Sequence, residues 1–327
     1  MRSTNKLRNR CMALLLAAGL MAGCAQEAPA LPYGTMDENE DFSMGNGIEQ
    51  TRLALFAEEL CAAAQDMTER SSIDPGTLKA ACVYDEGSAE ALYSYHAEEQ
   101  LSPASLTKIM TALLVLENCE NLDESVTIGN VNITENGAQL FPFHEGDRIS
   151  LKDLLYVTLV SSANDAALAL AQYMAGTEAD FAEMMNERAL QLGATHTHFV
   201  NSHGLSDDEH YTCAHDMYLI FREALKHPEF LQIIETDSYT FTYSSADGTL
   251  ITDEIHTTNQ YLRGISPSPA SVHILGGKTG STSAAGKCII LYAQTPEGGD
   301  YILVVMGAAD TDALYRTANR LCDDCIR

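Results

Sequence analysis

Tryptophan is absent from the sequence and aromatic residues of every kind are scarce, so any hydrophobic core has to be built from aliphatic side chains. Aromatic residues make up 7% of the 327 residues, whereas hydrophobic residues reach 46%, enough for one large domain or two small ones. Basic residues are equally scarce: 19 Lys and Arg stand against 46 Asp and Glu, a formal net charge of −27. A field of that sign repels phosphate backbones, so we expect no nucleic-acid partner and a protein that is soluble outside the cell.

The first hydrophobic run of the chain is too short to span a bilayer. It covers the eleven residues 12–22 and follows a basic stretch, which is typical of a signal peptide at 1–23. Met21-Ala22-Gly23 then precedes Cys24 and resembles the bacterial lipobox, at which Cys24 would carry diacylglycerol and become the mature N-terminus. The alternative is ordinary cleavage a few residues further on. We therefore expect an exported protein, held by an N-terminal lipid on the extracytoplasmic face of the bacterial cell membrane.

Composition and periodicity divide the rest of the chain into three parts. Residues 24–50 mix Pro, Gly and acidic residues with no apolar period, which indicates a disordered, acidic tether behind the lipidated N-terminus. Hydrophobic residues recur at helical spacing from Leu53 onward, and we expect an extra amphipathic helix within 51–76. The remainder, 77–327, is predicted to form one folded domain of the α+β class.

This domain is predicted to be an antiparallel sheet whose outer strands come from both of its ends, with helices packed on it and an α-helical insert. The expected strands cover 80–84, 91–95, 239–243, 272–274, 288–293 and 301–307, and the expected helices cover 105–117, 151–174, 178–192, 214–225 and 312–325.

The cysteines do not suggest a metal site. Of nine cysteines, seven remain once the leader and Cys24 are set aside, an odd number that cannot all pair within one chain. Cys322 and Cys325 are closely spaced, but no second such pair and no His cluster accompanies them, which argues against zinc. We expect mostly buried thiols.

The chemistry is expected at Ser105 and Lys108. Pro103 marks the start of a predicted helix, and a three-residue step places Ser105 and Lys108 on one face of it. A Ser hydroxyl alone is a weak nucleophile, whereas a desolvated Lys loses its proton more readily and accepts that of the hydroxyl. A backbone N–H at the helix start adds partial positive charge where an oxyanion would form. The pair therefore predicts that Ser105 is acylated and that the Lys108 amine activates it.

Two further short motifs accompany this pair. Ser162-Ala163-Asn164 begins 57 residues after Ser105, where a predicted helix gives way to polar residues, and Lys278-Thr279-Gly280 begins 173 residues after Ser105. S-x-x-K, S-x-N and K-T-G in that order form the signature of penicillin-recognising serine enzymes. Each motif is weak by itself, but their order and their places on the expected elements make coincidence remote.

The sequence resembles the low-molecular-weight penicillin-binding proteins, the D-alanyl-D-alanine carboxypeptidases of the S11 peptidase family, from about Ala80 to Cys325. The stretch 185–217 separates this family from its relatives, because the shared chemistry does not need it. The resemblance implies the penicillin-binding-protein/β-lactamase-like transpeptidase fold, with 77–327 as a serine D,D-carboxypeptidase catalytic domain. The segments that carry it are Pro103–Thr111, Ser162–Ala167, Met185-Asn186, Leu192-Gly193, Thr197-His198-Phe199, His203-Gly204-Leu205, Tyr211–Met217, Lys278–Thr282 and Ala285-Gly286.

The resemblance implies a role for each motif residue. Ser105 would attack the carbonyl of the penultimate D-Ala of a peptidoglycan stem peptide, and Lys108 would take its proton. Ser162 would relay the proton to the departing D-Ala, and Asn164 would hold the Lys and the substrate amide. Water would then hydrolyse the acyl-enzyme with no metal and no cofactor, and β-lactam antibiotics would act as covalent inhibitors. The predicted substrate-binding residues are Lys278 and Thr279 for the terminal carboxylate, Gly280, and Ser281, whose backbone N–H would form the oxyanion hole with that of Ser105.

The sequence departs from the family pattern in two places. Several members carry an Arg shortly after the strand that ends at Gly307-Ala308, where it helps to bind the substrate carboxylate. Leu314 occupies that position here; Arg316 is the predicted substitute, and Arg263 is a weaker candidate. Many members also continue into a small all-β domain and a C-terminal amphipathic helix, whereas this sequence stops at Arg327. We expect no C-terminal β domain, with membrane attachment moved to Cys24.

Three alternatives share parts of this pattern. A class A β-lactamase would need a Glu on a loop after the S-x-N motif, as E-x-x-L-N, and no such string lies between Asn164 and Lys278. A non-catalytic cell-wall scaffold would be consistent with the displaced Arg, but all four polar catalytic side chains are present. A D,D-endopeptidase would use the same residues as the carboxypeptidase and is left open.

Overall fold

The computed structural model of the chain describes residues 65–135 and 137–326. The predicted leader, Cys24 and the tether lie outside these residues, as does the predicted helix up to residue 64. The described part of that helix, 65–76, contains no α-helix, so the prediction is wrong there. Met67 instead exchanges two backbone hydrogen bonds with Ser94, at 2.7 and 3.0 Å, and a single 3₁₀ turn, Pro75–Thr77, follows. The reason is that the edge of a neighbouring strand offers unpaired backbone groups, which outweigh a weak helical period.

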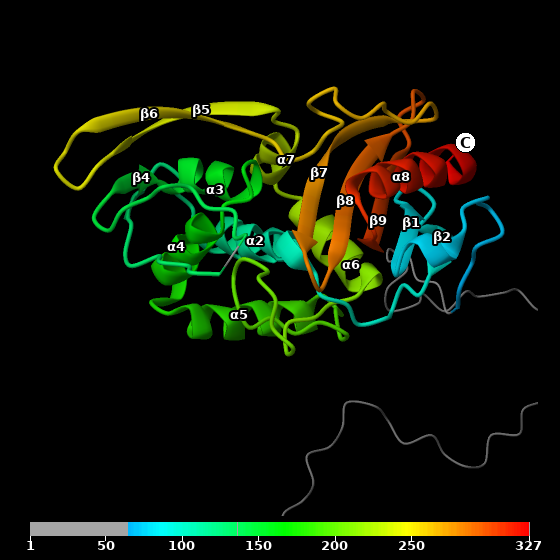
Figure 1. Cartoon of the computed structure of the whole chain (residues 1–327), viewed down its shortest axis with the longest axis horizontal. Coiled ribbons are helices and arrows are strands. Elements are labelled where there is room, and N and C mark those ends of the chain that lie inside the picture. Colours follow the sequence, from blue (N-terminus) through cyan, green and yellow to red (C-terminus); the bar gives the residue numbers. More distant parts are fainter. Residues whose placement is uncertain (1–64, 136, 327) are drawn as a thin grey trace, which may run out of the picture. The chain divides into compact units, whose positions relative to one another are not determined.

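A five-stranded antiparallel sheet forms the centre of the described chain, in the order β2-β1-β9-β8-β7 (Figure 1). Its N-terminal hairpin meets the C-terminal strands where β1 pairs with β9. The outer strands are β2, from the N-terminal hairpin, and β7, from the C-terminal group of strands, which confirms the predicted antiparallel sheet with outer strands from both ends of the domain. The strands are β1 (Ala80–Asp85), β2 (Glu90–Tyr95), β7 (His273–Thr282), β8 (Gly286–Gln294) and β9 (Asp300–Ala308).

Helices cover both faces of this sheet, which explains why the sequence of strand β9 is apolar from Ile302 to Met306. Ile302, Val304 and Met306 belong to the core under the helical insert. Leu303 and Val305 belong to a second core on the opposite face, beneath the C-terminal helix α8 (Thr311–Cys325). Successive side chains of a strand point to opposite faces, so a strand buried on both sides loses its polar alternation.

The insert between β2 and β7 brings helices together with a second, four-stranded sheet in the order β3-β4-β5-β6 (Figure 1). The sequence did not indicate β3, β4, β6 or α7, because they are short or largely polar. The elements are η2 (Ala104–Thr107), α2 (Lys108–Asn118), β3 (Ser125–Thr127), β4 (Arg148–Ser150), α3 (Leu151–Leu159), α4 (Asn164–Ala175), α5 (Glu178–Gln191), α6 (Ala214–Ala224), α7 (Pro228–Ile234), β5 (Ser238–Ser244) and β6 (Leu250–His256).

Two boundaries differ from the prediction in ways that matter for the site. The expected helix 151–174 is two helices, α3 and α4, separated by a turn in which Ser162 has φ 64°. The expected strand 272–274 runs on to Thr282, so Lys278-Thr279-Gly280 lies inside a strand that is hydrogen-bonded to β8. No helix in the described ranges combines the length and the hydropathy needed to cross a membrane.

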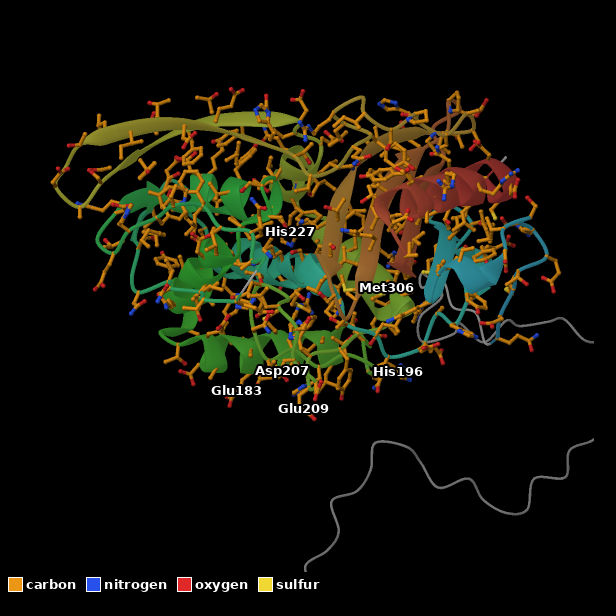
Figure 2. All side chains as sticks on the ribbon, in the orientation of Figure 1. Glu183, His196, Asp207, Glu209, His227 and Met306 are labelled. Carbon is orange, nitrogen blue, oxygen red and sulfur yellow. The ribbon has the colours of Figure 1, made fainter. Side chains whose placement is uncertain are left out.

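The buried thiols and the exposed acidic side chains agree with what the composition predicted. Cys213, Cys288 and Cys322 are buried thiols, as predicted. Glu183 on α5 and the loop residues Asp207 and Glu209 are exposed and project outward from the insert (Figure 2). Acidic side chains of this kind carry the net negative charge without entering the core.

Candidate active site

Ser105 and Lys108 meet at the junction of η2 and α2. The predicted helix begins with one 3₁₀ turn, Ala104–Thr107, before α2 starts at Lys108. Lys108 Nζ lies 3.0 Å from Ser105 Oγ, which confirms that the two side chains share a face. Ala104, immediately before the nucleophile, has φ 49°, a backbone conformation that costs energy outside glycine. The turn is therefore held by its surroundings.

The Lys108 amine sits among three oxygen atoms. Besides Ser105 Oγ, it lies 2.6 Å from Asn164 Oδ1 and 2.6 Å from the backbone oxygen of His203. An amide oxygen and a carbonyl oxygen only accept hydrogen bonds. A neutral amine has two N–H groups, so these two oxygens engage both of them and leave its lone pair directed at the Ser105 hydroxyl. The geometry favours proton transfer from Ser105 to Lys108.

Burial supplies the neutral amine that this geometry needs. Lys108 is fully buried, and this desolvation lowers the pKa of its ammonium well below the ordinary value. The positive charge of Lys278 lowers the pKa further, whereas the nearby Asp165 carboxylate raises it. Burial in turn raises the pKa of Asp165 to about 6. Lys108 thus has the character of a general base.

Ser162 and Lys278 form a second pair opposite the first. Ser162 is placed by the strained turn ahead of α4, and Lys278 comes from β7. Lys278 Nζ donates to Ser162 Oγ at 2.8 Å and to the backbone oxygen of Thr279 at 2.8 Å. Burial lowers the pKa of Lys278 to about 7, so this amine is also able to exchange a proton near neutral pH.

Glycine at 280 allows β7 to lie against the nucleophile. A Cβ at Gly280 would stand 3.1 Å from the backbone nitrogen of Ser105 and 3.1 Å from Pro103 O. Contacts that short are tighter than most real ones, so a side chain would push the strand away. The Ser105 N–H is thereby held beside Gly280, one residue before Ser281. The predicted oxyanion hole requires this arrangement of Ser105 and Ser281.

A neutral histidine, His210, braces the turn that carries Ser105. His210 Nδ1 accepts from Val200 N at 3.0 Å, so its proton lies on Nε2 and points at Thr107 Oγ1, 2.8 Å away. Thr107 Oγ1 in turn donates to Ala104 O at 2.8 Å. Burial lowers the pKa of His210 to about 4 and that of His203 to about 3, so both rings are uncharged at neutral pH. No local motif in the sequence signals this support.

A cavity of about 330 Å³ opens over Ser105. Thr258 Oγ1 and Thr279 Oγ1 lie 2.5 Å apart on one wall. Gln139, Thr258 and Gln260 come from loops far from the motifs, and the sequence offered no reason to select them. The cavity is lined by Ser105, Gly137, Gln139, Ser162, Thr258, Gln260, Thr279, Gly280, Ser281, Lys287, Cys288, Thr311, Leu314 and Tyr315.

The structure brings together every predicted motif residue and leaves out one predicted substitute. Ser105, Lys108, Ser162, Asn164 and the segment from Lys278 to Ser281 all lie at or beside the cavity. Arg316 does not: it is exposed on α8, while Leu314 and Tyr315 of the same helix line the cavity. Its prediction as a carboxylate-binding residue is not supported, because a step of two residues turns a helical side chain away from the preceding face.

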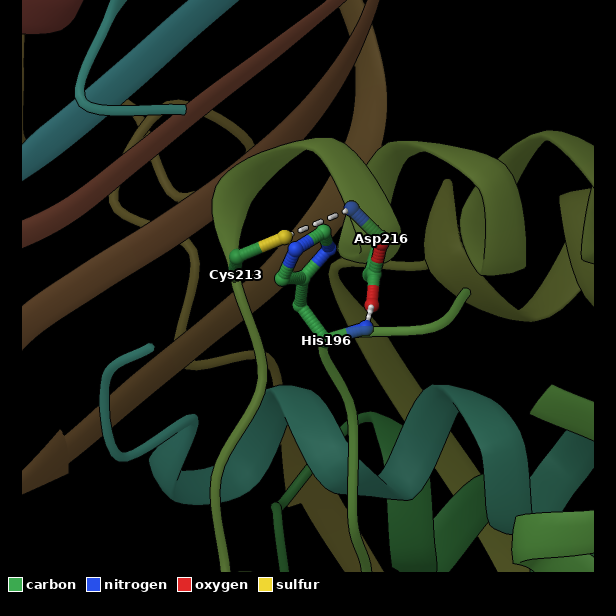
Figure 3. A group of neighbouring side chains, drawn as sticks. All are labelled: His196, Cys213 and Asp216. Atoms are coloured by element: carbon green, nitrogen blue, oxygen red, sulfur yellow. Dashed lines mark hydrogen bonds between the residues drawn. The ribbon is translucent and has the colours of Figure 1, made fainter. Parts of the chain in front are cut away.

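One cluster away from Ser105 has metal-ligand residue types. The ligand atoms of His196, Cys213 and Asp216 lie within 4.8 Å of one another (Figure 3). Asp216 Oδ2 already accepts from His196 N at 2.8 Å and from Thr197 Oγ1 at 2.7 Å, and Cys213 Sγ caps α6 by accepting from Asp216 N at 3.3 Å. Burial raises the pKa of the Cys213 thiol, which keeps it protonated. These bonds give the cluster a structural role, in which it joins the 196–197 loop to the start of α6.

The chain matches proteins of known sequence over most of the described region. The model of the peptidase S11 family, described as D-alanyl-D-alanine carboxypeptidase, matches residues 66–310. D-alanyl-D-alanine carboxypeptidase DacC of Escherichia coli is 32% identical over 273 residues, covering 80% of this chain and 63% of the relative. The D-alanyl-D-alanine carboxypeptidase of a Streptomyces species is 30% identical over 275 residues, covering 80% and 92%. D-alanyl-D-alanine endopeptidase of Escherichia coli is 30% identical over 241 residues, covering 74% of each chain.

Solved structures agree with the sequence comparison. The Streptomyces K15 DD-transpeptidase superposes with a TM-score of 0.69 at 28% identity, covering 76% of this chain and 96% of that one. Penicillin-binding protein D2 of Listeria monocytogenes, in its cefotaxime-bound form, gives 0.60 at 30% identity, covering 74% and 94%. The chain spans only 46% to 63% of the length of several curated carboxypeptidases that it matches, DacC among them. With its Ser–Lys pair, its strand-borne Lys278-Thr279-Gly280 and this shared fold, the chain belongs to the peptidase S11 family.

Proposed function

We propose that the protein is a serine-type D-Ala-D-Ala carboxypeptidase that removes the terminal D-Ala from peptidoglycan stem pentapeptides through an acyl-enzyme on Ser105. The observation that carries the proposal is the buried Lys108 amine, whose two N–H groups are engaged by Asn164 Oδ1 and His203 O while Ser105 Oγ lies 3.0 Å away. The names of the relatives and the depressed pKa of Lys108 support it.

The reaction follows from the positions of the two Ser–Lys pairs. Ser105 Oγ attacks the carbonyl carbon of the penultimate D-Ala as its proton passes to the Lys108 lone pair. The C–N bond of the tetrahedral intermediate then breaks as the leaving nitrogen takes the proton that Lys108 accepted, relayed by the Ser162 hydroxyl, which is hydrogen-bonded to Lys278. Lys108 is neutral again at this point. Free D-Ala departs and leaves an ester on Ser105. Water attacks that ester as Lys108 takes one of its protons, and Lys108 returns this proton to Ser105 Oγ as the ester bond breaks, which releases the tetrapeptide stem and restores Ser105.

The same site is expected to bind β-lactams as covalent inhibitors. The described residues that line the cavity over Ser105 include no carboxylate. A class A β-lactamase needs such a group to activate the deacylating water. We therefore expect the penicilloyl-enzyme to persist rather than to turn over. The relatives include D-alanyl-D-alanine endopeptidases, so cleavage of D-Ala-containing cross-links is the second candidate activity.

Release of D-Ala tests the proposal directly. The wild-type protein should liberate D-Ala from a stem pentapeptide and should be labelled by a fluorescent penicillin, and Ser105→Ala should do neither. A non-catalytic scaffold would give no label and no difference between the two proteins. Rapid hydrolysis of nitrocefin by the wild type would contradict the carboxypeptidase assignment, and release from cross-linked dimers faster than from pentapeptide would favour the endopeptidase.

We also propose that the protein is exported, loses residues 1–23 and is attached to the outer face of the cell membrane by a lipid on Cys24. This proposal rests on the order of a basic stretch, the hydrophobic run 12–22 and Met21-Ala22-Gly23 before Cys24. Cells fed a fatty acid with an alkyne tag should label the wild-type protein and not the Cys24→Ser variant. Equal labelling of both, or of neither, would contradict the lipid attachment.

A further inference from the structure

The substrate of the proposed reaction ends in a carboxylate, and the site needs a positive charge to hold it. Lys278 and Arg316, the two cations predicted to bind this carboxylate, are poorly placed. Lys278 is 1% exposed, lies beneath the cavity rather than on its lining, and commits two of its three N–H groups to Ser162 Oγ and Thr279 O. A pKa of about 7 further reduces its mean charge at neutral pH. Arg316 is exposed elsewhere on α8.

The wall of the cavity carries a different cation. Among the described residues that line it, Lys287 is the one with a positively charged side chain. Lys287 lies on β8 directly opposite Ser281 on β7. Residues directly opposite in an antiparallel pair project from the same face of the sheet. Lys287 Nζ donates to Ser281 Oγ at 2.8 Å, so the ammonium group already lies beside β7.

The hydroxyl groups around Lys287 complete a site for an anion. Thr279 and Ser281 are two residues apart on β7 and face the cavity together, with Thr258 Oγ1 beside Thr279 Oγ1. Ser281 Oγ accepts from Lys287, so its own proton is free to be donated to a carboxylate oxygen. Leu314 and Tyr315 line the same cavity and exclude water from one side without adding charge. A local cation counts for more in a chain of net charge −27, because the overall field repels an anionic substrate.

We propose that Lys287 binds the terminal carboxylate of the substrate, together with the hydroxyl groups of Thr279 and Ser281, and so makes this enzyme select a free C-terminal acid. The proposal rests on the proposed carboxypeptidase function and names its carboxylate-binding cation. A hydrogen bond to a charged partner contributes enough to change kcat/KM by roughly tenfold to a hundredfold.

Two peptides that differ only at the C-terminus test this assignment. Diacetyl-L-lysyl-D-Ala-D-Ala carries the free carboxylate, and the corresponding D-alaninamide peptide lacks it. The wild type should prefer the acid. Lys287→Met should lower kcat/KM for the acid by roughly tenfold to a hundredfold, mainly through KM, and change cleavage of the amide less than about threefold. Lys287→Arg should retain most of the preference, and Arg316→Met, the matched control, should retain all of it.

Each contrary result is distinct. If Lys287→Met keeps the wild-type preference, or lowers cleavage of both peptides equally, Lys287 does not bind the carboxylate. If Arg316→Met removes the preference, the charge comes from α8 and the assignment is wrong. If the wild type cleaves neither peptide and takes up no fluorescent penicillin, the proposed function fails and the assignment to Lys287 fails with it.

Discussion

Replacing Gly204 with alanine should inactivate the enzyme from outside the cavity. Gly204 has φ 88°, and a Cβ on it would stand 1.9 Å from Ala104 O and 2.8 Å from Thr107 Oγ1. Real Cβ atoms essentially never approach closer than 3.0 Å, so the loop or the Ser105 turn must move by about 1 Å. The residue before Gly204 supplies the carbonyl that holds Lys108 Nζ at 2.6 Å. A shift of that size weakens this bond and misplaces the nucleophile.

The size of both effects follows from the contacts. A left-handed backbone costs alanine about 1 to 2 kcal/mol, and forcing a methyl group against backbone adds about 1 to 3 kcal/mol. A misplacement of about 1 Å near reacting groups costs about a hundredfold in rate. The free energy of unfolding of Gly204→Ala should therefore fall by about 2 to 5 kcal/mol, and its rate constant for acylation by fluorescent penicillin by about a hundredfold.

Gly176→Ala is the matched control. Gly176 has φ 80°, and a Cβ there would meet nothing within 4 Å, so the variant carries the backbone strain without the clash. It should lose about 1 to 2 kcal/mol in urea denaturation and acylate at the wild-type rate. If Gly204→Ala acylates as fast as Gly176→Ala and unfolds at the same urea concentration, the supposed close approach to the Ser105 turn is wrong.

Three further predictions concern charged groups. Asp165→Asn removes a carboxylate that raises the pKa of Lys108, so the acid limb of the pH–rate profile for penicillin acylation should move to lower pH. Asp207→Asn, at an exposed position, should leave that limb in place, and an unmoved limb in Asp165→Asn would refute the coupling. Lys278 has a folded-state pKa of about 7, below its unfolded value, so the free energy of unfolding of the wild type should rise relative to that of Lys278→Met between pH 7 and pH 10. Urea titrations should show a rise of up to about 1.4 kcal/mol per pH unit, and a difference independent of pH would show that Lys278 stays charged. Arg188 on α5 donates to both oxygens of Glu117 on α2 and to Glu223 on α6, so Arg188→Met should lower the free energy of unfolding by about 1 to 3 kcal/mol and leave the acylation rate of the folded protein unchanged. This loss of stability should be smaller in high salt, and a loss that salt does not affect would point to packing instead.

The motif residues could be predicted from the sequence because their chemistry depends on local spacing. A three-residue step on a helix fixes where Ser105 and Lys108 lie relative to each other, whatever the rest of the fold. The apolar runs at β8 and β9 likewise determine buried strands by themselves. For that reason the prediction of one antiparallel sheet, with strands from both ends of the domain, was confirmed.

The supports of the site were not predictable in the same way. The chain from His210 through Thr107 to Ala104 joins residues about a hundred positions apart, and no local pattern signals such a contact. The sequence pointed to Arg316 on α8 as the carboxylate-binding cation, because a position in the sequence does not show which face of a helix carries the side chain. Lys287 becomes visible only when the pairing of β7 with β8 places it opposite Ser281.

Because β1 pairs with β9, the central sheet cannot form until β9 has been synthesised. Ala80 faces Met306 and Asp85 faces Tyr301, so β1 pairs with a strand that is synthesised much later than itself. Contacts so distant along the chain form slowly, because the long intervening loop must close first. Lys278 and Gly280, which complete the surroundings of Ser105, also arrive late in synthesis. A nascent chain therefore holds Ser105 and Lys108 without the strand that completes their surroundings, and a chain that ends before β9 should remain unfolded and inert.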